Sequence, residues 1–219
     1  LTGEKMTMDD AELIERYRAE SKAQNMPLDG TCLDRLHVDC LKTNNRDAAK
    51  RVADGIRITK ALGVRVMLMP FFGKCATQPA DFDSTADLLR ELSPEAEKAH
   101  VILGLENTLS AEDNVRIMDK AKSKVVKVYY DVGNSTNNHH DVLKEIPWLG
   151  KDRICQFHLK DNPHYLGEGS IDFAKILAEI AQLGFDGFAN LETDAPSKVI
   201  DDDMRKNLAF VRGIMAHSA

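Results

Sequence analysis

The chain has 219 residues, of which 43% are hydrophobic and 6% aromatic, so it can bury the core of a globular domain. Its formal net charge of −6 disfavours a nucleic-acid-binding surface, because such surfaces depend on clustered Lys and Arg. No hydrophobic run approaches the ~20 residues that a membrane-spanning helix needs, so we expect no membrane partner.

The spacing of hydrophobic residues alternates between the periods of a helix and of a strand. In chain order it predicts a helix at 12–24, a strand at 30–41, a helix at 45–63, a strand at 64–70, a helix at 84–100, a strand at 101–107, a helix at 110–123, a strand at 125–134, a helix at 140–150, a strand at 154–161, a helix at 170–184, a strand at 188–193 and a helix at 202–215. Gly63 suits a left-handed helix end, and Pro94 is expected to divide its helix into two segments.

This alternation predicts an α/β fold with a parallel sheet covered by helices. The chain contains no linker or low-complexity segment, so we expect residues 1–219 to form a single domain. Two architectures fit, an open doubly wound sheet and a (β/α)8 TIM barrel. The glycine-rich phosphate-binding motifs that mark many doubly wound sheets are absent from the sequence.

Polar residues stand at the carboxyl ends of four successive predicted strands, namely Glu106, Asp131, His158 and Glu192. Their positions are 25, 27 and 34 residues apart, so each interval fits one strand and one helix. Residues at such intervals return to the same rim of a parallel barrel, where barrel enzymes place their active sites. This pattern favours the barrel over the open sheet.

Three carboxylates and one imidazole on one rim would repel one another and lose solvation. A divalent cation removes that cost, and oxygen-rich ligation with one histidine suits Mn²⁺, Mg²⁺ or Co²⁺. Taken singly, each acidic residue also fits a helix cap or a surface charge, and His158 also fits a buried core histidine. The joint pattern favours a metal site.

The four cysteines, Cys32, Cys40, Cys75 and Cys155, are scattered singly along the chain. This spacing favours reduced thiols over a disulfide framework, and therefore a cytoplasmic location. The sequence begins with Leu1, and we expect the native N-terminus, with any signal, to lie outside it.

Several strand ends carry a family resemblance: VILGLEN, VYYDVGN, QFHLKD with the following LGEGSIDF, and LGFDGFANLET. They resemble the sugar phosphate isomerase/epimerase superfamily, whose members are xylose isomerase-like TIM barrels, over residues 46–215. The resemblance implies one divalent ion, with Mn²⁺ first and Mg²⁺, Co²⁺ or Zn²⁺ as alternatives. It implies Glu106, Asp131, His158 and Glu192 as metal ligands, with Glu106 and Glu192 also as catalytic acid and base. Six strands are predicted against the family's eight, so the first βαβ portion is expected to be missing from this chain.

Two positions depart from the ketose 3-epimerases of this superfamily. Asn134 stands where those enzymes carry a histidine, and His164 stands where they carry an arginine. We expect Asn107, Asn134, Lys160 and His164 to contact substrate, with solvated loop positions as the alternative and, for Lys160, a structural ion pair. Lys160 lies two residues beyond His158 and therefore on the same side of an extended strand. The adjacent Asp161 receives no role from the sequence beyond holding a loop or cap.

The expected activity is a metal-dependent sugar isomerase or epimerase that acts through an enediolate by proton transfer between carboxylates and carbon. One alternative is a metal-dependent dehydratase of an inosose-like keto-polyol. Two further alternatives are a nuclease of the AP endonuclease type and a barrel retained as a binding module. The expected partner is a small sugar or keto-polyol, and homo-oligomer formation is left open.

Overall fold

The computed structural model describes residues 6–217, and the chain divides into two compact units. The first contains the chain up to Asn107 together with Glu112–Lys127, and the second contains Thr108–Ala111 together with the chain from Val128 onward. The two units are described separately below, and the expectation of a single domain stays a prediction. Among the helices of residues 6–217, none has the length and hydrophobicity needed to cross a membrane.

The first unit contains three parallel strands, β1 (Gly30–Cys32), β2 (Val66–Pro70) and β3 (Ile102–Glu106), with β2 between the other two. Val66 pairs with Gly30 on one side and with Ile102 on the other. All five residues of β2 are buried, as expected for a parallel strand covered on both faces. Near-continuous hydrophobic sequence therefore marks β2, whereas β1 (Gly-Thr-Cys) is only partly buried.

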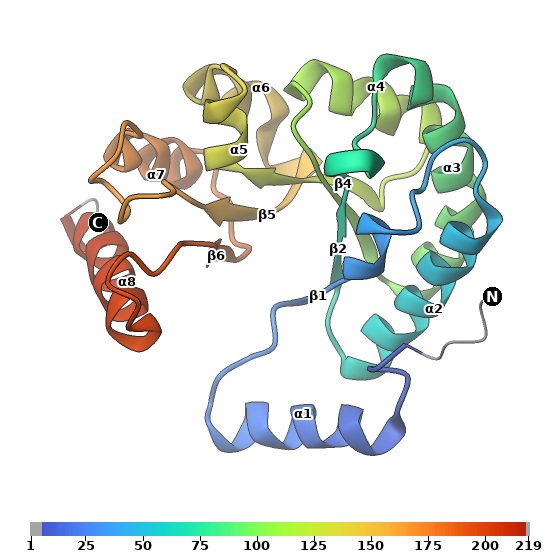
Figure 1. Ribbon diagram of the computed structural model, residues 1–219, viewed down its shortest axis with the longest axis horizontal. Coiled ribbons are helices and arrows are strands. Elements are labelled where there is room, and N and C mark those ends of the chain that lie inside the picture. The colour runs from blue at the N-terminus through green and yellow to red at the C-terminus, as the bar shows by residue number, and fades with distance from the viewer. Residues whose placement is uncertain (1–5, 218–219) are drawn as a thin grey trace. The chain divides into compact units, whose positions relative to one another are not determined.

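Helices of the first unit cover these strands, with α2 and α3 packed side by side (Figure 1). The helices are α1 (Ala11–Ala23), α2 (Arg46–Leu62), α3 (Phe82–Ala99) and α4 (Ala111–Ala121), and the short 3-10 turns are Asp34–His37, Gly73–Cys75 and Pro79–Asp81. α1 lies against α2 through a small hydrophobic cluster. The cluster contains Ile14, Ile58, Leu62 and Val64, with Met6, Met8 and Leu28 packed on it.

The predicted ends of α2 are confirmed, and local chemistry explains both. The Asn45 side chain accepts hydrogen bonds from the backbone N–H groups of Asp47 and Ala48, which the helix itself leaves unpaired. At the other end Gly63 has φ 80°, a left-handed conformation that glycine adopts without steric cost.

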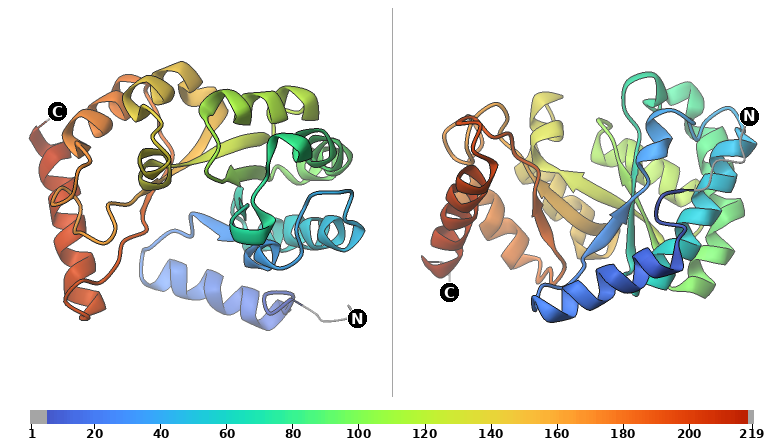
Figure 2. Two further views of the ribbon diagram at one scale, coloured as in Figure 1. Left: turned by 45° about the horizontal axis from the view of Figure 1, so that its top comes forward. Right: turned by 60° about the horizontal axis from the view of Figure 1, so that its bottom comes forward.

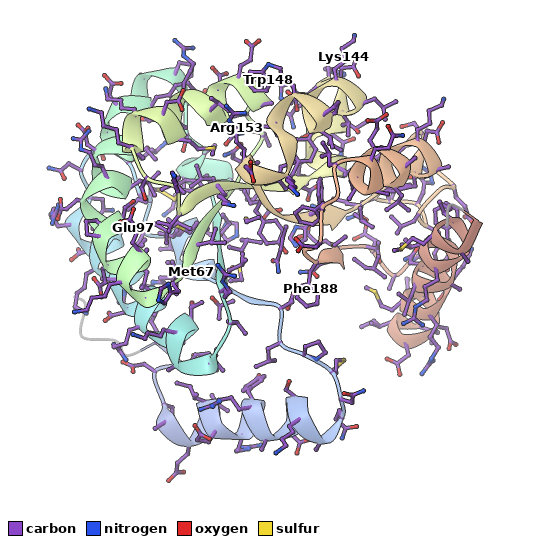
Figure 3. All side chains as sticks on the ribbon, turned by 180° about the vertical axis from the view of Figure 1, so that it is seen from behind. Met67, Glu97, Lys144, Trp148, Arg153 and Phe188 are labelled. Atoms are coloured by element: carbon purple, nitrogen blue, oxygen red, sulfur yellow. A yellow bond between two sulfur atoms is a disulfide. The ribbon has the colours of Figure 1, made fainter. Side chains whose placement is uncertain are left out.

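The second unit contains three parallel strands, β4 (Val126–Asp131), β5 (Ile154–Leu159) and β6 (Ala189–Leu191). The first two residues of β4 belong to the first unit. Its helices are α5 (Val132–Asn137), α6 (Val142–Arg153), α7 (Phe173–Gln182) and α8 (Ile200–His217). α7 packs against both α6 and α8, as both views in Figure 2 show. On α6, Lys144 and Trp148 point away from the strands of this unit, with Trp148 50% exposed (Figure 3).

Three sequence predictions are wrong in detail. The strand predicted at 30–41 ends at Cys32, because the chain turns into a 3-10 helix whose Leu36 is fully buried. The strand predicted at 125–134 ends at Asp131, whose side chain caps α5. Pro94 does not divide α3, because proline's fixed φ is compatible with a helix and buried leucines on its preceding turns keep the helix packed.

The prediction of reduced cysteines is wrong for one pair. Cys40 and Cys75 form a disulfide across 35 residues of sequence, with their Cα atoms 4.8 Å apart, while Cys32 and Cys155 take no part in a disulfide. The pairing arises because the segments that follow β1 and β2 meet in space, which the spacing of cysteines along the chain does not reveal. Reduced thiols therefore no longer support a cytoplasmic location, which stays a prediction.

Replacing both Cys40 and Cys75 by serine is expected to lower the free energy of unfolding by about 2 to 4 kcal/mol, because the open chain gains conformational entropy. Urea denaturation of the oxidised protein and the double variant measures the difference. Cys32→Ser, at an exposed cysteine outside the disulfide, is the control and should change stability little. Equal midpoints for the double variant and the control would show that the disulfide contributes nothing.

Candidate functional site

Parallel register within the second unit brings the predicted strand-end residues together. Asp131 of β4 pairs with His158 of β5, and His158 pairs with Asn190 of β6. Glu192 follows Asn190 by two residues, so its side chain projects from the same face of the sheet, two residues further toward the carboxyl end of the strand. One ligand atom from each of Asp131, His158 and Glu192 lies within 4.8 Å of the others.

The two carboxylate oxygens of Asp131 have different surroundings. Oδ1 accepts a hydrogen bond of 2.7 Å from the Asn134 N–H and thereby caps α5. Oδ2 is buried and accepts no aligned hydrogen bond from any residue of the described range 6–217. The helix-cap and ligand interpretations of Asp131 are therefore compatible, because each uses its own oxygen.

The imidazole of His158 is held between a carboxylate cluster and an aromatic ring. Its Nδ1 lies 3.4 Å from Glu192 Oε2 and 3.7 Å from Asp131 Oδ2. The ring packs against Tyr129, with ring centroids 4.6 Å apart, and the Tyr129 hydroxyl accepts a hydrogen bond from the Asn190 side chain. Tyr129 and Asn190 therefore fix the orientation of the His158 ring.

Lys160 places a positive charge among the same groups. Its Nζ lies 2.9 Å from Asp131 Oδ2, forms an ion pair with Glu192, and reaches Asn134 Oδ1 at 3.4 Å. The Asp131 side chain is fully buried, whereas 47% of the Glu192 side chain is exposed. Glu192 therefore stands at the solvent side of the cluster and Asp131 at its floor.

The pKa values of these groups reflect burial and mutual attraction. Burial raises the pKa of Asp131, but the nearby His158 imidazole, the hydrogen bond from the Asn134 N–H and the charge of Lys160 outweigh it and lower the pKa to about 2. Burial raises the pKa of Glu192 despite its ion pair with Lys160. Burial lowers the pKa of Lys160, but the two carboxylates outweigh it, so the pKa is raised. The surroundings therefore favour the charged form of Asp131, whereas burial favours the protonated form of Glu192.

Asp161, to which the sequence assigned no site role, holds the loop that follows β5. Its buried carboxylate accepts hydrogen bonds from the backbone N–H groups of Gly167 at 3.3 Å and Gly169 at 3.0 Å. A Cβ at position 169 would lie 2.2 Å from Asp161 Oδ1, so only glycine allows this approach. The LGEGS segment is therefore a loop wrapped around a buried anion.

Replacing Asp161 by alanine is expected to lower the free energy of unfolding by about 2 kcal/mol, because the backbone N–H groups of Gly167 and Gly169 lose their carboxylate acceptor. Amide hydrogen exchange at Gly167 and Gly169 should accelerate, and urea denaturation gives the stability change. Asp186→Ala, at an exposed loop position, is the control and should stay within about 0.5 kcal/mol of the parent. Unchanged exchange at both glycines would contradict the assigned role.

A second buried aspartate ties this loop to the segment that follows β6. Asp203 accepts hydrogen bonds from the Tyr165 hydroxyl at 2.6 Å, the Ser197 hydroxyl at 2.7 Å and the Ser197 N–H at 3.0 Å. Asn207 adds a link, since its side chain accepts from the Leu166 N–H and donates to the Thr193 hydroxyl. The loop after β5 and the segment after β6 are thus both anchored to α8.

The other predicted site residues lie in varied surroundings. Glu106 is the last residue of β3 in the first unit and is 4% exposed. Asn107 exchanges two side-chain hydrogen bonds with Asn114, which occupy its amide. His164 is exposed and lines a polar pocket of about 430 Å³ together with Asn137, Glu168 and other residues of the loop after β5. The roles of these residues stay predictions.

Sequence reasoning missed the supporting residues of the cluster. Tyr129 and Asn190 each lie two residues before a predicted ligand, so strand alternation could have indicated them. Asp203 stands in a run of three aspartates at a helix start, which resembles a solvated surface cluster. Its burial depends on loops distant in sequence.

Parallel strands alternating with helices, and carboxylates with a histidine at strand ends, define the class as a β/α barrel protein with a strand-end site. Residues 3–214 match the family model described as xylose isomerase-like TIM barrel. The chain belongs to this family, which confirms the predicted fold and resemblance. The family barrel has eight strands, and six are present in the described residues.

Solved structures with the same fold include several epimerases. The apo form of 3-keto-D-glucoside 4-epimerase YcjR from E. coli is 17% identical with a TM-score of 0.76, covering 93% of this chain and 85% of that chain. D-psicose 3-epimerase from Clostridium cellulolyticum H10, with D-tagatose, is 18% identical with a TM-score of 0.76, covering 94% and 84%. At these sequence identities, the structural similarity shows that this chain shares the fold of these epimerases.

A curated relative is the uncharacterized protein MJ1311 from Methanocaldococcus jannaschii, 26% identical over 126 residues. The match covers 50% of this chain and 43% of that protein. The chain therefore matches less than half the length of this relative.

Proposed function

We propose that this protein is a divalent-metal-dependent sugar isomerase or epimerase that moves a proton on carbon next to a carbonyl group. The observation that carries the proposal is the buried Asp131 Oδ2, which lacks an aligned hydrogen bond from residues 6–217 and faces His158 and Glu192. A buried anionic oxygen is costly unless a cation compensates it. The Lys160 ammonium group does so in this structure, and a divalent ion would do so at the same oxygens.

The three side chains fit a small divalent ion. Ligand atoms that surround such an ion at about 2.1 Å lie about 3 Å apart, and the imidazole and carboxylate atoms here are separated by 3.4 and 3.7 Å. Carboxylate oxygens with one imidazole nitrogen suit Mn²⁺, with Mg²⁺, Co²⁺ or Zn²⁺ as alternatives. Tyr129 packs against the His158 ring at a tilt of 59° and so helps to hold the orientation in which the imidazole would bind the ion.

Glu106 is proposed as the fourth ligand on the basis of its sequence position. It ends β3 as Asp131 ends β4, and carboxyl ends of consecutive strands share a rim in this family's barrel. Epimerases among the solved structures of the same fold support the same reaction class.

The chain's own residues perform the proton transfer. Glu192, half-exposed and with a raised pKa, is suited to take a proton from carbon and return it. Glu106 is the proposed partner on the opposite side of the substrate, so inversion at carbon results when one glutamate removes the proton and the other delivers it. A bound divalent ion would supply the positive charge that stabilises negative charge developing on the substrate oxygens.

Substrate recognition is assigned to polar groups near the cluster. Lys160 and Asn134 contact each other beside Asp131, and His164 lies on the loop held by Asp161. Asn107 is kept as a candidate, although its contact with substrate requires that it leave Asn114. The proposed ligand is a small sugar or keto-polyol with several hydroxyl groups.

Solvent deuterium exchange tests the reaction class. The purified protein, loaded with Mn²⁺, is incubated in D₂O with ketoses, aldoses and inososes, and NMR records deuterium at carbon and the products formed. Exchange with a ketose or aldose supports the proposal, and loss of a hydroxyl from an inosose would replace it with the dehydratase. Absence of exchange with every compound, while Mn²⁺ is bound, would refute the proposed proton transfer.

A further inference from the structure

Lys160 occupies the position among the carboxylates that a cation would take. Its Nζ lies 2.9 Å from Asp131 Oδ2 and also pairs with Glu192. Both carboxylates belong to the proposed ligand set. The ammonium group therefore neutralises the same oxygens to which a divalent ion would bind.

The backbone around Lys160 fixes the start of its side chain. A Cβ at Gly133 would lie 2.8 Å from Lys160 Cβ, Cγ and backbone oxygen. The backbone of α5 therefore packs closely against the first carbons of the Lys160 side chain. Only 14% of the Lys160 side chain is exposed. Nζ also lies 3.4 Å from Asn134 Oδ1, on α5 and beside the cluster. The ammonium group therefore has a second polar contact available when it leaves the carboxylates.

We propose that Lys160 is an internal counter-cation that holds Asp131 and Glu192 in place without metal and must be displaced from both carboxylates when the divalent ion binds. This inference rests on the proposed function, because it concerns the same ligands. Lys160 is a positioning residue in the metal-free protein, and after displacement it is free to contact substrate oxygens.

The inference predicts opposite effects on stability and on metal affinity. Without Lys160, the buried Asp131 carboxylate loses its compensating charge, so the metal-free protein should be less stable. The divalent ion would meet no competing ammonium and no repulsion from it, so its affinity should rise. A residue with a merely structural role would lower stability and leave affinity unchanged or lower.

The test compares the wild-type protein with Lys160→Met after removal of metal. Isothermal titration with Mn²⁺ alone should give a dissociation constant at least about tenfold lower for the variant. The metal-free variant should melt several degrees lower, and Mn²⁺ should raise its melting temperature more than that of the wild type. Lys175→Met, which removes an exposed lysine paired with Asp172, is the control and should change neither quantity.

Equal or weaker Mn²⁺ affinity in the folded Lys160→Met variant would overturn this inference alone. Failure of Mn²⁺ to bind either protein would overturn the metal site and this inference with it. Should the variant not fold without metal, acetylation of wild-type lysines followed by mass spectrometry decides the matter. Labelling of Lys160 relative to Lys175 should increase several-fold on addition of Mn²⁺, and unchanged labelling would overturn the inference.

Discussion

Replacing Glu192 by glutamine is expected to lower solvent deuterium exchange into a sugar substrate by about 10³-fold. A positioned general acid or base contributes roughly 10² to 10⁴ in rate, and glutamine cannot accept the proton. The substitution keeps the size of the side chain and can keep a neutral oxygen toward the cluster. NMR measurement of exchange, together with Mn²⁺ titration of the same samples, separates loss of proton transfer from loss of metal.

Glu168→Gln is the matched control for this experiment. Glu168 is also an exposed glutamate of the second unit paired with a lysine, Lys206, and it lies on the loop after β5. Its substitution should leave the exchange rate within about threefold of the parent, because an exposed ion pair contributes little. Retention of most activity in Glu192→Gln with Mn²⁺ bound would rule out Glu192 as the proton-transferring group.

Replacing Asp131 by asparagine is expected to weaken Mn²⁺ binding by more than about 100-fold. Even residues that only support metal ligands cost about 10- to 100-fold in affinity when they are replaced, and Asp131 Oδ2 is a proposed ligand itself. Asparagine can still cap α5 through Oδ1, so the fold around it should persist. Isothermal titration measures the affinity, and circular dichroism checks that the variant is folded.

Asp172→Asn provides the comparison for Asp131→Asn. Asp172 likewise caps a helix, accepting a hydrogen bond from the Lys175 N–H at 3.1 Å, and likewise pairs with a lysine, but it lies away from the cluster. Its substitution should leave Mn²⁺ affinity unchanged. Unaltered Mn²⁺ affinity in Asp131→Asn would show that the metal binds elsewhere.

Chelation of metal from the wild-type protein should abolish deuterium exchange into the substrate, and added Mn²⁺ should restore it.

Most elements of the fold were predictable because their signals are local. The apolar runs at 64–70 and 154–161 contain the buried strands β2 and β5, and the helix predicted at 45–63, with its end at Gly63, corresponds to α2. The failures occurred where distant contacts decide. The segment after Cys32 turns into a 3-10 helix and is joined to Cys75 by the disulfide of Cys40, and neither feature has a local sequence signal.

The candidate site divides in the same way. The sequence alone determined which residue types stand at strand ends and at what intervals, because a βα unit has a nearly constant length and strands alternate side chains between two faces. That was sufficient to predict a parallel barrel with Glu106, Asp131, His158 and Glu192 at strand ends, and the resemblance of the strand ends added the xylose isomerase-like type.

Only the tertiary structure decided how these groups are used. It assigned one Asp131 oxygen to the α5 cap and left the other facing the cluster, and it placed the Lys160 ammonium between two carboxylates. It also gave Asp161 its role as the anchor of a glycine loop. The physical reason is that strand periodicity fixes the face from which a side chain leaves, whereas its partners are set by loops and strands that meet only in the folded chain.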